Sequence, residues 1–277
     1  MGRTAHSAGA GVPYFRLVSA FLIVNPRSGR GGPDPGRLVA EARKLGVETH
    51  LLGAGDDPGD VARNSGADVL GIAGGDGSLA SVAEVALARD ASFVCVPFGT
   101  RNHFARDLGL DRNDPLAALQ AFADGKERRI DVGRADDRLF LNNVSLGVYA
   151  RLVHRRERHR RRRQTFARLR AWAIVVTQRH ALGITIDGEH VEARIVLVAN
   201  NAYVLDLPSI GERDRLDEGR LHLYVPGDER VAERFVIDAA AGRLQAAVDG
   251  EPDVLETPVD FRIEPRALRV LVPAERS

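Results

Sequence analysis

The segment Gly74-Gly75-Asp76-Gly77-Ser78 follows the apolar run Val69–Ile72, and after it Leu79, Val82 and Ala86 repeat with helical spacing. Because glycine has no Cβ, a strand that turns into a helix through such a segment lets backbone N–H groups approach a phosphate closely. The dipole of the following helix favours negative charge at the same point. The segment therefore predicts a strand-to-helix loop that binds phosphate.

A second loop, Pro97-Phe98-Gly99-Thr100-Arg101-Asn102, follows another apolar run, Phe93–Val96. Thr100 and Asn102 can bond nucleotide phosphates, or they can cap a helix predicted over 101–108. An acid in a phosphate-binding loop repels phosphate unless it handles Mg²⁺ or a proton. Asp76 is therefore interpreted as a group that takes part in the chemistry.

Short apolar runs alternate with amphipathic segments over residues 15–125, which predicts an α/β domain with a parallel sheet covered on both faces. Ligands of such sheets bind at the carboxyl ends of the strands, where both loops fall. Residues 126–272 contain short β-rich runs, and Asp187-Gly188 has the pattern of a hairpin turn. We expect a second, antiparallel β domain here, with its final strands packing back towards the first domain.

The composition is that of an ordinary globular protein: 277 residues, 44% hydrophobic, 28% charged, with a net charge of +1. The single cysteine, Cys95, lies in an apolar run and is expected to be buried. No apolar stretch reaches the 18 residues that a membrane span needs, and Met1–Pro13 lacks the apolar core of a signal peptide. We therefore expect a cytoplasmic protein with a loose N-terminal tail, and we expect any membrane contact to be peripheral, at the inner face.

Five blocks in order, with the two loops counted together as one, resemble the catalytic domain of the diacylglycerol kinase family, which includes sphingosine kinases and bacterial lipid kinases. They are Val24–Gly29, the two loops over 74–78 and 97–106, Phe140–Gly147, Leu216–Gly219 and Asp249–Glu251. The resemblance implies a Rossmann-like α/β domain followed by a β-sandwich-like domain, with the active site in the cleft between them. It also implies ATP-dependent transfer of the γ-phosphate to a lipid hydroxyl, with Mg²⁺ and a lipid substrate at a membrane surface.

The resemblance also implies roles for individual residues. Glu251 is the expected general base and Asp76 the second catalytic residue. Glu218 and Asp217 are the expected Mg²⁺ ligands. The expected nucleotide-binding residues are Asn25, Gly74, Gly75, Asp76, Gly77, Ser78, Thr100 and Asn102. Asp187-Gly188-Glu189 repeats the three letters of the last block, but its hairpin pattern indicates a turn without a catalytic role.

Two positions depart from the family pattern. Leu79-Ala80-Ser81 lacks the Asn-Glu pair that usually follows the glycine loop, and Glu218 stands where aspartate is usual. A solvated acidic turn is the alternative interpretation of Asp217 and Glu218. For the whole chain, the alternatives are a soluble kinase of the NAD kinase or phosphofructokinase type, and a nucleotide-binding protein without catalysis.

Arg151–Arg170 contains ten arginines and precedes the apolar run Ala171–Val176. Such a segment suits an anionic membrane surface or a solvated face. Nucleic acid is not expected, because only Phe166 interrupts the arginines as an aromatic residue that could stack on bases. The sequence leaves open a homodimer and the identity of the lipid, since apolar pockets leave no motif.

Overall fold

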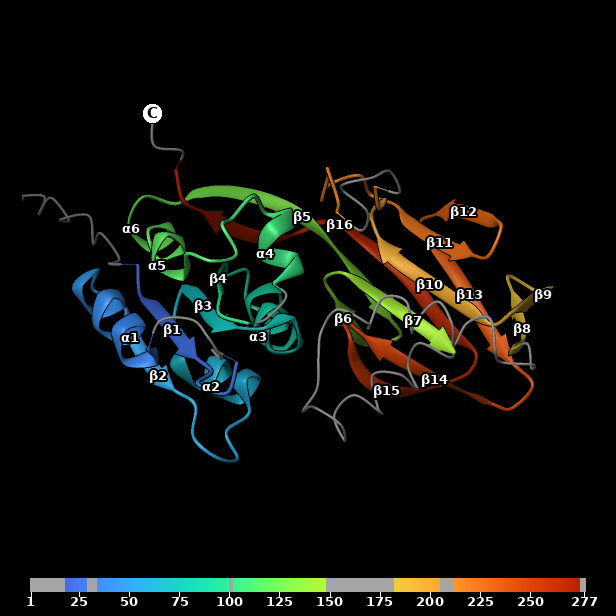
Figure 1. The fold of residues 1–277 in the computed structure, drawn as a ribbon, viewed down its shortest axis with the longest axis horizontal. Coiled ribbons are helices and arrows are strands. Elements are labelled where there is room, and N and C mark those ends of the chain that lie inside the picture. The colour runs from blue at the N-terminus through green and yellow to red at the C-terminus, as the bar shows by residue number, and fades with distance from the viewer. Residues whose placement is uncertain (1–17, 29–33, 100–101, 148–181, 205–211, 275–277) are drawn as a thin grey trace, which may run out of the picture.

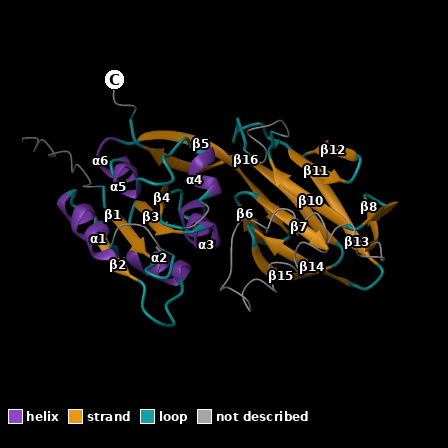
Figure 2. Cartoon of the chain, viewed as in Figure 1, coloured by secondary structure: helices purple, strands orange, loops and turns teal. Residues whose placement is uncertain are grey.

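The computed structural model describes residues 18–28, 34–99, 102–147, 182–204 and 212–274. These residues form two lobes that lie side by side along the long axis of the molecule (Figure 1). The labelled helices all belong to one lobe, and the other lobe consists of strands and loops (Figure 2).

The described residues of the first lobe form a helix-covered parallel sheet. Its strands are β1 (Ala20–Val24), β2 (Glu48–Leu51), β3 (Val69–Gly74) and β4 (Ser92–Pro97), in the order β2-β1-β3-β4. Its helices are α1 (Pro35–Lys44), α2 (Pro58–Ser65), α3 (Asp76–Ala88), α4 (His103–Asp107), α5 (Pro115–Ala118) and α6 (Ala121–Asp124). Strand β1 shows why both faces are covered: Ile23 packs in one core with α2 and α3, whereas Leu22 and Val24 pack in another with α1 and α5. The α/β prediction is confirmed.

The second lobe is antiparallel. From residue 126 onwards the described residues form the strands β5 (Lys126–Ala135), β6 (Arg138–Phe140), β7 (Asn143–Gly147), β8 (Leu182–Ile186), β9 (Glu189–Ala193), β10 (Ile195–Asn200), β11 (Leu221–Val225), β12 (Asp228–Ala232), β13 (Arg234–Ala239), β14 (Arg243–Val248), β15 (Glu251–Glu256) and β16 (Val259–Val272). Six of them form one sheet in the order β12-β11-β10-β7-β14-β15. Its inner face packs on β13, β16 and β8 through a shared apolar core in which Phe140 and Phe261 meet edge to face. The prediction of an antiparallel sandwich-like region is confirmed.

Strands β5 and β16 run through both lobes (Figure 1). They pair with each other from Ala135–Phe261 in the second lobe to Lys126–Val272 in the first, and Val270 pairs with Phe93 of β4. The parallel sheet of the first lobe therefore continues into the second. For this reason the boundary between residues 125 and 126 stays a prediction.

Several local predictions can be compared with the structure. The hairpin at Asp187-Gly188 joins β8 to β9, and Cys95 is buried, as predicted. The helix predicted over 101–108 is observed over His103–Asp107. No helix of the described residues is both long and apolar enough to cross a bilayer. Met1–Pro13, Arg151–Arg170 and Thr100 lie outside the described residues.

Candidate active site

The two glycine-containing loops pack directly against each other at the carboxyl ends of β3 and β4. Phe98 N donates a hydrogen bond to Gly74 O at 3.1 Å, which continues the pairing of the strands. A Cβ on Gly99 would lie 2.6 Å from Gly75 Cα, so any side chain there would push the loops apart. Gly74, Gly75, Gly77 and Gly99 do not have positive φ. A Cβ would meet another atom closer than 3.0 Å at Gly74, Gly77 and Gly99, so these three positions need glycine for its small size and not for a left-handed backbone, whereas a Cβ on Gly75 would make ordinary contacts.

The glycine loop leads directly into α3. Gly75 is the N-cap residue, and α3 begins at Asp76. The first-turn amides of a helix have no acceptor within the helix, and the positive end of the dipole lies there. Ser78 turns its hydroxyl back onto the loop and donates to Gly75 O at 2.9 Å. The result is a compact helix start that can bind an anion such as a phosphate.

The turn after β1 lies beside this loop. Asn25 N donates to Ala73 O at 2.9 Å, and Asn25 Oδ1 accepts from Arg27 N at 3.1 Å. Ser28 Oγ lies 4.0 Å from the position that a Cβ on Gly75 would take. Asn25 thus shapes the edge of the glycine loop, and its contact with a nucleotide stays a prediction.

Glu251, the expected general base, lies against the glycine loop although it is distant in sequence. Its Cγ and Cδ lie 2.6 Å from the position of a Cβ on Gly77, so its side chain occupies the space that any other residue at position 77 would fill. Glu251 is the first residue of β15 and comes from the second lobe. The fold therefore brings a carboxylate from one lobe onto the helix start of the other.

Asp249 fixes the turn that carries Glu251. Its carboxylate accepts hydrogen bonds from the backbone N–H groups of Leu141 (2.8 Å), Asn142 (2.7 Å) and Asn143 (3.1 Å). Burial raises the pKa of Asp249 to about 6, against the opposing effect of these three hydrogen bonds. Two of the predicted blocks, around Asn142 and Asp249, are thus joined by one buried carboxylate.

The second Asp-Gly-Glu segment has the same turn geometry but a different environment. Asp187 and Gly188 have φ of 51° and 85°, close to the 47° and 86° of Asp249 and Gly250. Glu189, however, is 72% exposed and forms an ion pair with Arg230 at 3.0 Å. Local sequence sets the turn in both copies, and only the tertiary position places one of them at the glycine loop.

Asp76 links the two loops. Its carboxylate accepts from His103 N at 3.2 Å and Phe104 N at 3.3 Å, the first amides of α4. Asn102 does not cap α4 with its side chain. Instead, buried Asn102 closes its own loop, with Oδ1 accepting from Gly99 N at 2.8 Å and Nδ2 donating to Gly99 O at 3.0 Å. The capping role proposed for Asn102 is therefore wrong, and Asp76 takes it from another loop.

The carboxylates expected to bind Mg²⁺ have other partners. Glu218 accepts from Ala202 N at 3.1 Å and contacts His222 Nε2 at 3.2 Å. Asp217 forms ion pairs with Arg215 and Arg266. The described part of the chain contains no group of three or more His, Cys, Asp or Glu side chains that could hold a metal ion. Both carboxylates are thus paired with protein groups, and their role as Mg²⁺ ligands stays a prediction.

A buried aspartate that the sequence analysis missed holds the segment around Glu218. Asp131 is 1% exposed, and its carboxylate accepts from Gly219 N at 2.6 Å and Arg266 N at 2.7 Å. Its signal was present in the sequence, because a single acid interrupts the apolar pair Ile130 and Val132 in a strand. A charge at such a position needs partners when it is buried.

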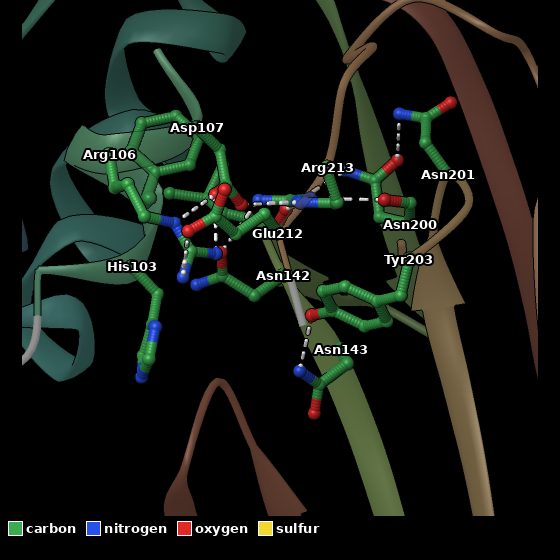
Figure 3. A network of polar contacts seen from close by, with 12 residues as sticks. His103, Arg106, Asp107, Asn142, Asn143, Asn200, Asn201, Tyr203, Glu212 and Arg213 are labelled. Carbon is green, nitrogen blue, oxygen red and sulfur yellow. Dashed lines mark hydrogen bonds and ion pairs between the residues drawn. The ribbon is translucent and has the colours of Figure 1, made fainter. Parts of the chain in front are cut away.

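A second missed feature is a buried polar network between α4 and the second lobe (Figure 3). Arg213 Nε donates to Asp107 Oδ2 at 2.8 Å, and these side chains are 0% and 1% exposed. The other guanidinium nitrogens donate to Leu141 O, Asn200 O and Asn142 Oδ1 at 2.7 to 3.0 Å. No local pattern indicates this network, because Asp107 and Arg213 are 106 positions apart.

Comparison with known proteins agrees with the resemblance of the sequence blocks. Residues 19–135 match the family model for the diacylglycerol kinase catalytic domain. The chain is 30% identical over 147 residues to a diacylglycerol kinase of Bacillus subtilis, covering 50% of this chain and 48% of the relative. It is 39% identical over 141 residues to a probable YegS-like lipid kinase of Pseudomonas aeruginosa, covering 48% and 45%. The matched region thus spans about half the length of these curated relatives.

A crystal structure described as a diacylglycerol kinase from Bacillus anthracis is similar over nearly the whole fold. The TM-score is 0.68 with 21% sequence identity, and the superposition covers 93% of this chain and 97% of the other. At this identity the likeness concerns the fold, and it confirms the predicted combination of a parallel α/β sheet with an antiparallel sheet.

Proposed function

We propose that this chain, whose residues 19–135 match the diacylglycerol kinase catalytic domain, is an ATP-dependent lipid kinase that transfers the γ-phosphate to the hydroxyl of diacylglycerol or a related lipid alcohol. The single observation that carries the proposal is the position of Glu251 over Gly77. A phosphate-binding helix start and a carboxylate that can accept a proton are two of the groups that phosphoryl transfer to an alcohol requires, and the other is Mg²⁺.

In this proposal the glycine loop binds the nucleotide phosphates through main-chain amides, because Gly74, Gly75 and Gly77 carry no side chains of their own. The close approach of Gly75 and Gly99 sets the floor of the site. Asn25, Ser78, Thr100 and Asn102 are the other residues proposed to contact the nucleotide. Mg²⁺ carried with ATP would neutralise charge on the transferring group, and Asp76 is the loop carboxylate that could hold it.

Glu251 is the proposed general base. It accepts the proton of the lipid hydroxyl as the oxygen forms its bond to the γ-phosphorus, and the bond from that phosphorus to the bridging oxygen of ADP breaks. Asp249 keeps the Glu251 turn in place through its three backbone hydrogen bonds. Asp76 orients the second loop from the opposite side.

A cytoplasmic location is part of the proposal, since ATP and a membrane lipid would meet at the inner face of the membrane. Peripheral membrane contact through Arg151–Arg170 stays a prediction, because that segment lies outside the described residues. A homodimer also stays a prediction. No nucleic acid partner is proposed.

The test is incubation of the purified chain with radiolabelled ATP and Mg²⁺. Separate reactions would contain mixed micelles of diacylglycerol, a sphingoid base, phosphatidylglycerol or a polyprenol, and two further reactions would contain NAD or fructose 6-phosphate. We expect label in a lipid product. Glu251→Gln should lose this labelling, whereas the matched variant Glu189→Gln should keep it. Label in NAD or fructose 6-phosphate, or full activity of Glu251→Gln, would contradict the proposal.

A further inference from the structure

The polar contacts around the candidate site form a closed ring. Asp76, next to the glycine loop, holds the start of α4, and Asp107 at the end of α4 binds Arg213. Arg213 binds the Leu141–Asn143 segment, which in turn is held by Asp249. From Asp249 the chain passes through Gly250 to Glu251, which lies back on the glycine loop at Gly77.

Arg213 is the point at which this ring crosses from the first lobe to the second (Figure 3). Its guanidinium makes four hydrogen bonds, one to α4 and three to groups of the second lobe, and its side chain is fully buried. The planar fork of arginine gives these bonds fixed directions, which a lysine ammonium cannot reproduce. The guanidinium therefore sets how far α4 lies from the Leu141–Asn143 segment.

A buried ion pair is weak evidence for stability, because an apolar replacement of similar volume often stabilises a protein as well. Arg213 does more than pair with Asp107, however. It also donates to the backbone carbonyl of Leu141 and to the side-chain Oδ1 of Asn142. The backbone N–H groups of the same two residues donate to the Asp249 carboxylate. The acceptors of this segment are thus bound by Arg213 and its N–H donors by Asp249.

We propose that Arg213 is a positioning residue that sets the place of the Glu251 carboxylate relative to the glycine loop. This inference rests on the proposed function only for its effect on turnover, since the geometric part concerns the backbone of Leu141–Asn143 and Asp249–Glu251. The hydrogen bonds of Arg213 go to Asp107, Leu141, Asn142 and Asn200, and the inference is that it acts on Glu251 through the backbone between them.

The test compares Arg213→Lys with Arg220→Lys. Arg220 forms an exposed ion pair with Glu233 at 2.8 Å, so its variant controls for an arginine-to-lysine change as such. Two properties are measured: amide hydrogen exchange, peptide by peptide, and steady-state kinetics with the lipid that the wild-type chain phosphorylates in the labelling experiment. In Arg213→Lys we expect exchange at 141–143 and 249–251 to rise about tenfold or more, with α3 changed less than about twofold. We expect kcat to fall at least about tenfold while KM for ATP stays within about twofold.

Three results would overturn the inference: unchanged exchange at 141–143, an equal rise across the molecule, or a local rise with unchanged kcat. If Arg213→Lys does not fold, Asn142→Ala removes one acceptor without unpairing a charge and is measured in the same way. If the wild-type chain phosphorylates no lipid, the proposed function fails, and the exchange pattern alone decides whether Arg213 fixes the Glu251 turn.

Discussion

The side chain of Glu251 lies on Gly77, in the place that a Cβ at that position would occupy. A methyl group there would displace the carboxylate, whereas alanine itself favours helix formation over glycine by up to about 1 kcal/mol. We therefore expect Gly77→Ala to keep its thermal stability and lose kcat by about 10²-fold. Gly183→Ala is the control, because a Cβ on Gly183 meets open space and its φ is not positive. Equal kcat of Gly77→Ala and Gly183→Ala would show that catalysis does not need the Glu251 carboxylate in its position on Gly77.

Loss of Asp76 should separate a structural effect from a chemical one. Asp76→Ala removes the acceptor for two N–H groups at the start of α4, a loss of about 1 kcal/mol in the free energy of unfolding. Asp57→Ala removes a comparable cap, since Asp57 accepts from Asp60 N at the start of α2. We expect similar stability losses in urea unfolding, but a fall in kcat of about 10²-fold or more only for Asp76→Ala. An equal loss of kcat in Asp76→Ala and Asp57→Ala would show that Asp76 acts only as a helix cap.

Asp249 should give the stability an unusual pH dependence. Burial raises its pKa from 3.8 to about 6, so between these values the folded protein binds more protons at this group than the unfolded chain. This contribution is fully present below pH 3.8 and is lost as the pH rises through 6, about 3 kcal/mol in total. Urea unfolding of wild type and Asp249→Asn between pH 4 and 7 measures it. We expect wild type to lose stability relative to the variant as the pH rises, and parallel curves would contradict the shift.

Divalent cations should not stabilise the segment around Glu218, because His222 and Ala202 N already occupy its carboxylate. A metal site filled at 100 times its Kd would add about 2.7 kcal/mol. We expect the thermal unfolding temperature without nucleotide to be the same in EDTA and in Mg²⁺, to within about 1 °C. Glu218→Ala should lower it, since the variant leaves a buried imidazole and an amide with one partner fewer. A rise with Mg²⁺ that Glu218→Ala abolishes would confirm the metal site predicted from the sequence.

Much of the fold could be predicted because its signals are local. The apolar runs that became β1, β3 and β4, and the helical repeat that became α3, each encode burial within a few residues of chain. The turn at Asp187-Gly188 was predicted for the same reason. Glu251 was identified only by the order of the family blocks, because its local pattern matches that of Glu189.

The sequence by itself determined the periodicity, the turns and the glycines, because each of these depends on the preferences of neighbouring residues. Only the tertiary structure decided which buried charges meet. Asp107 and Arg213, 106 positions apart, pair because both are withdrawn from water at the same point between the lobes, where neither could remain without the other. The packing of Gly99 on Gly75 and the return of β16 to β4 are decided in the same way, by close approach in space that no local pattern encodes.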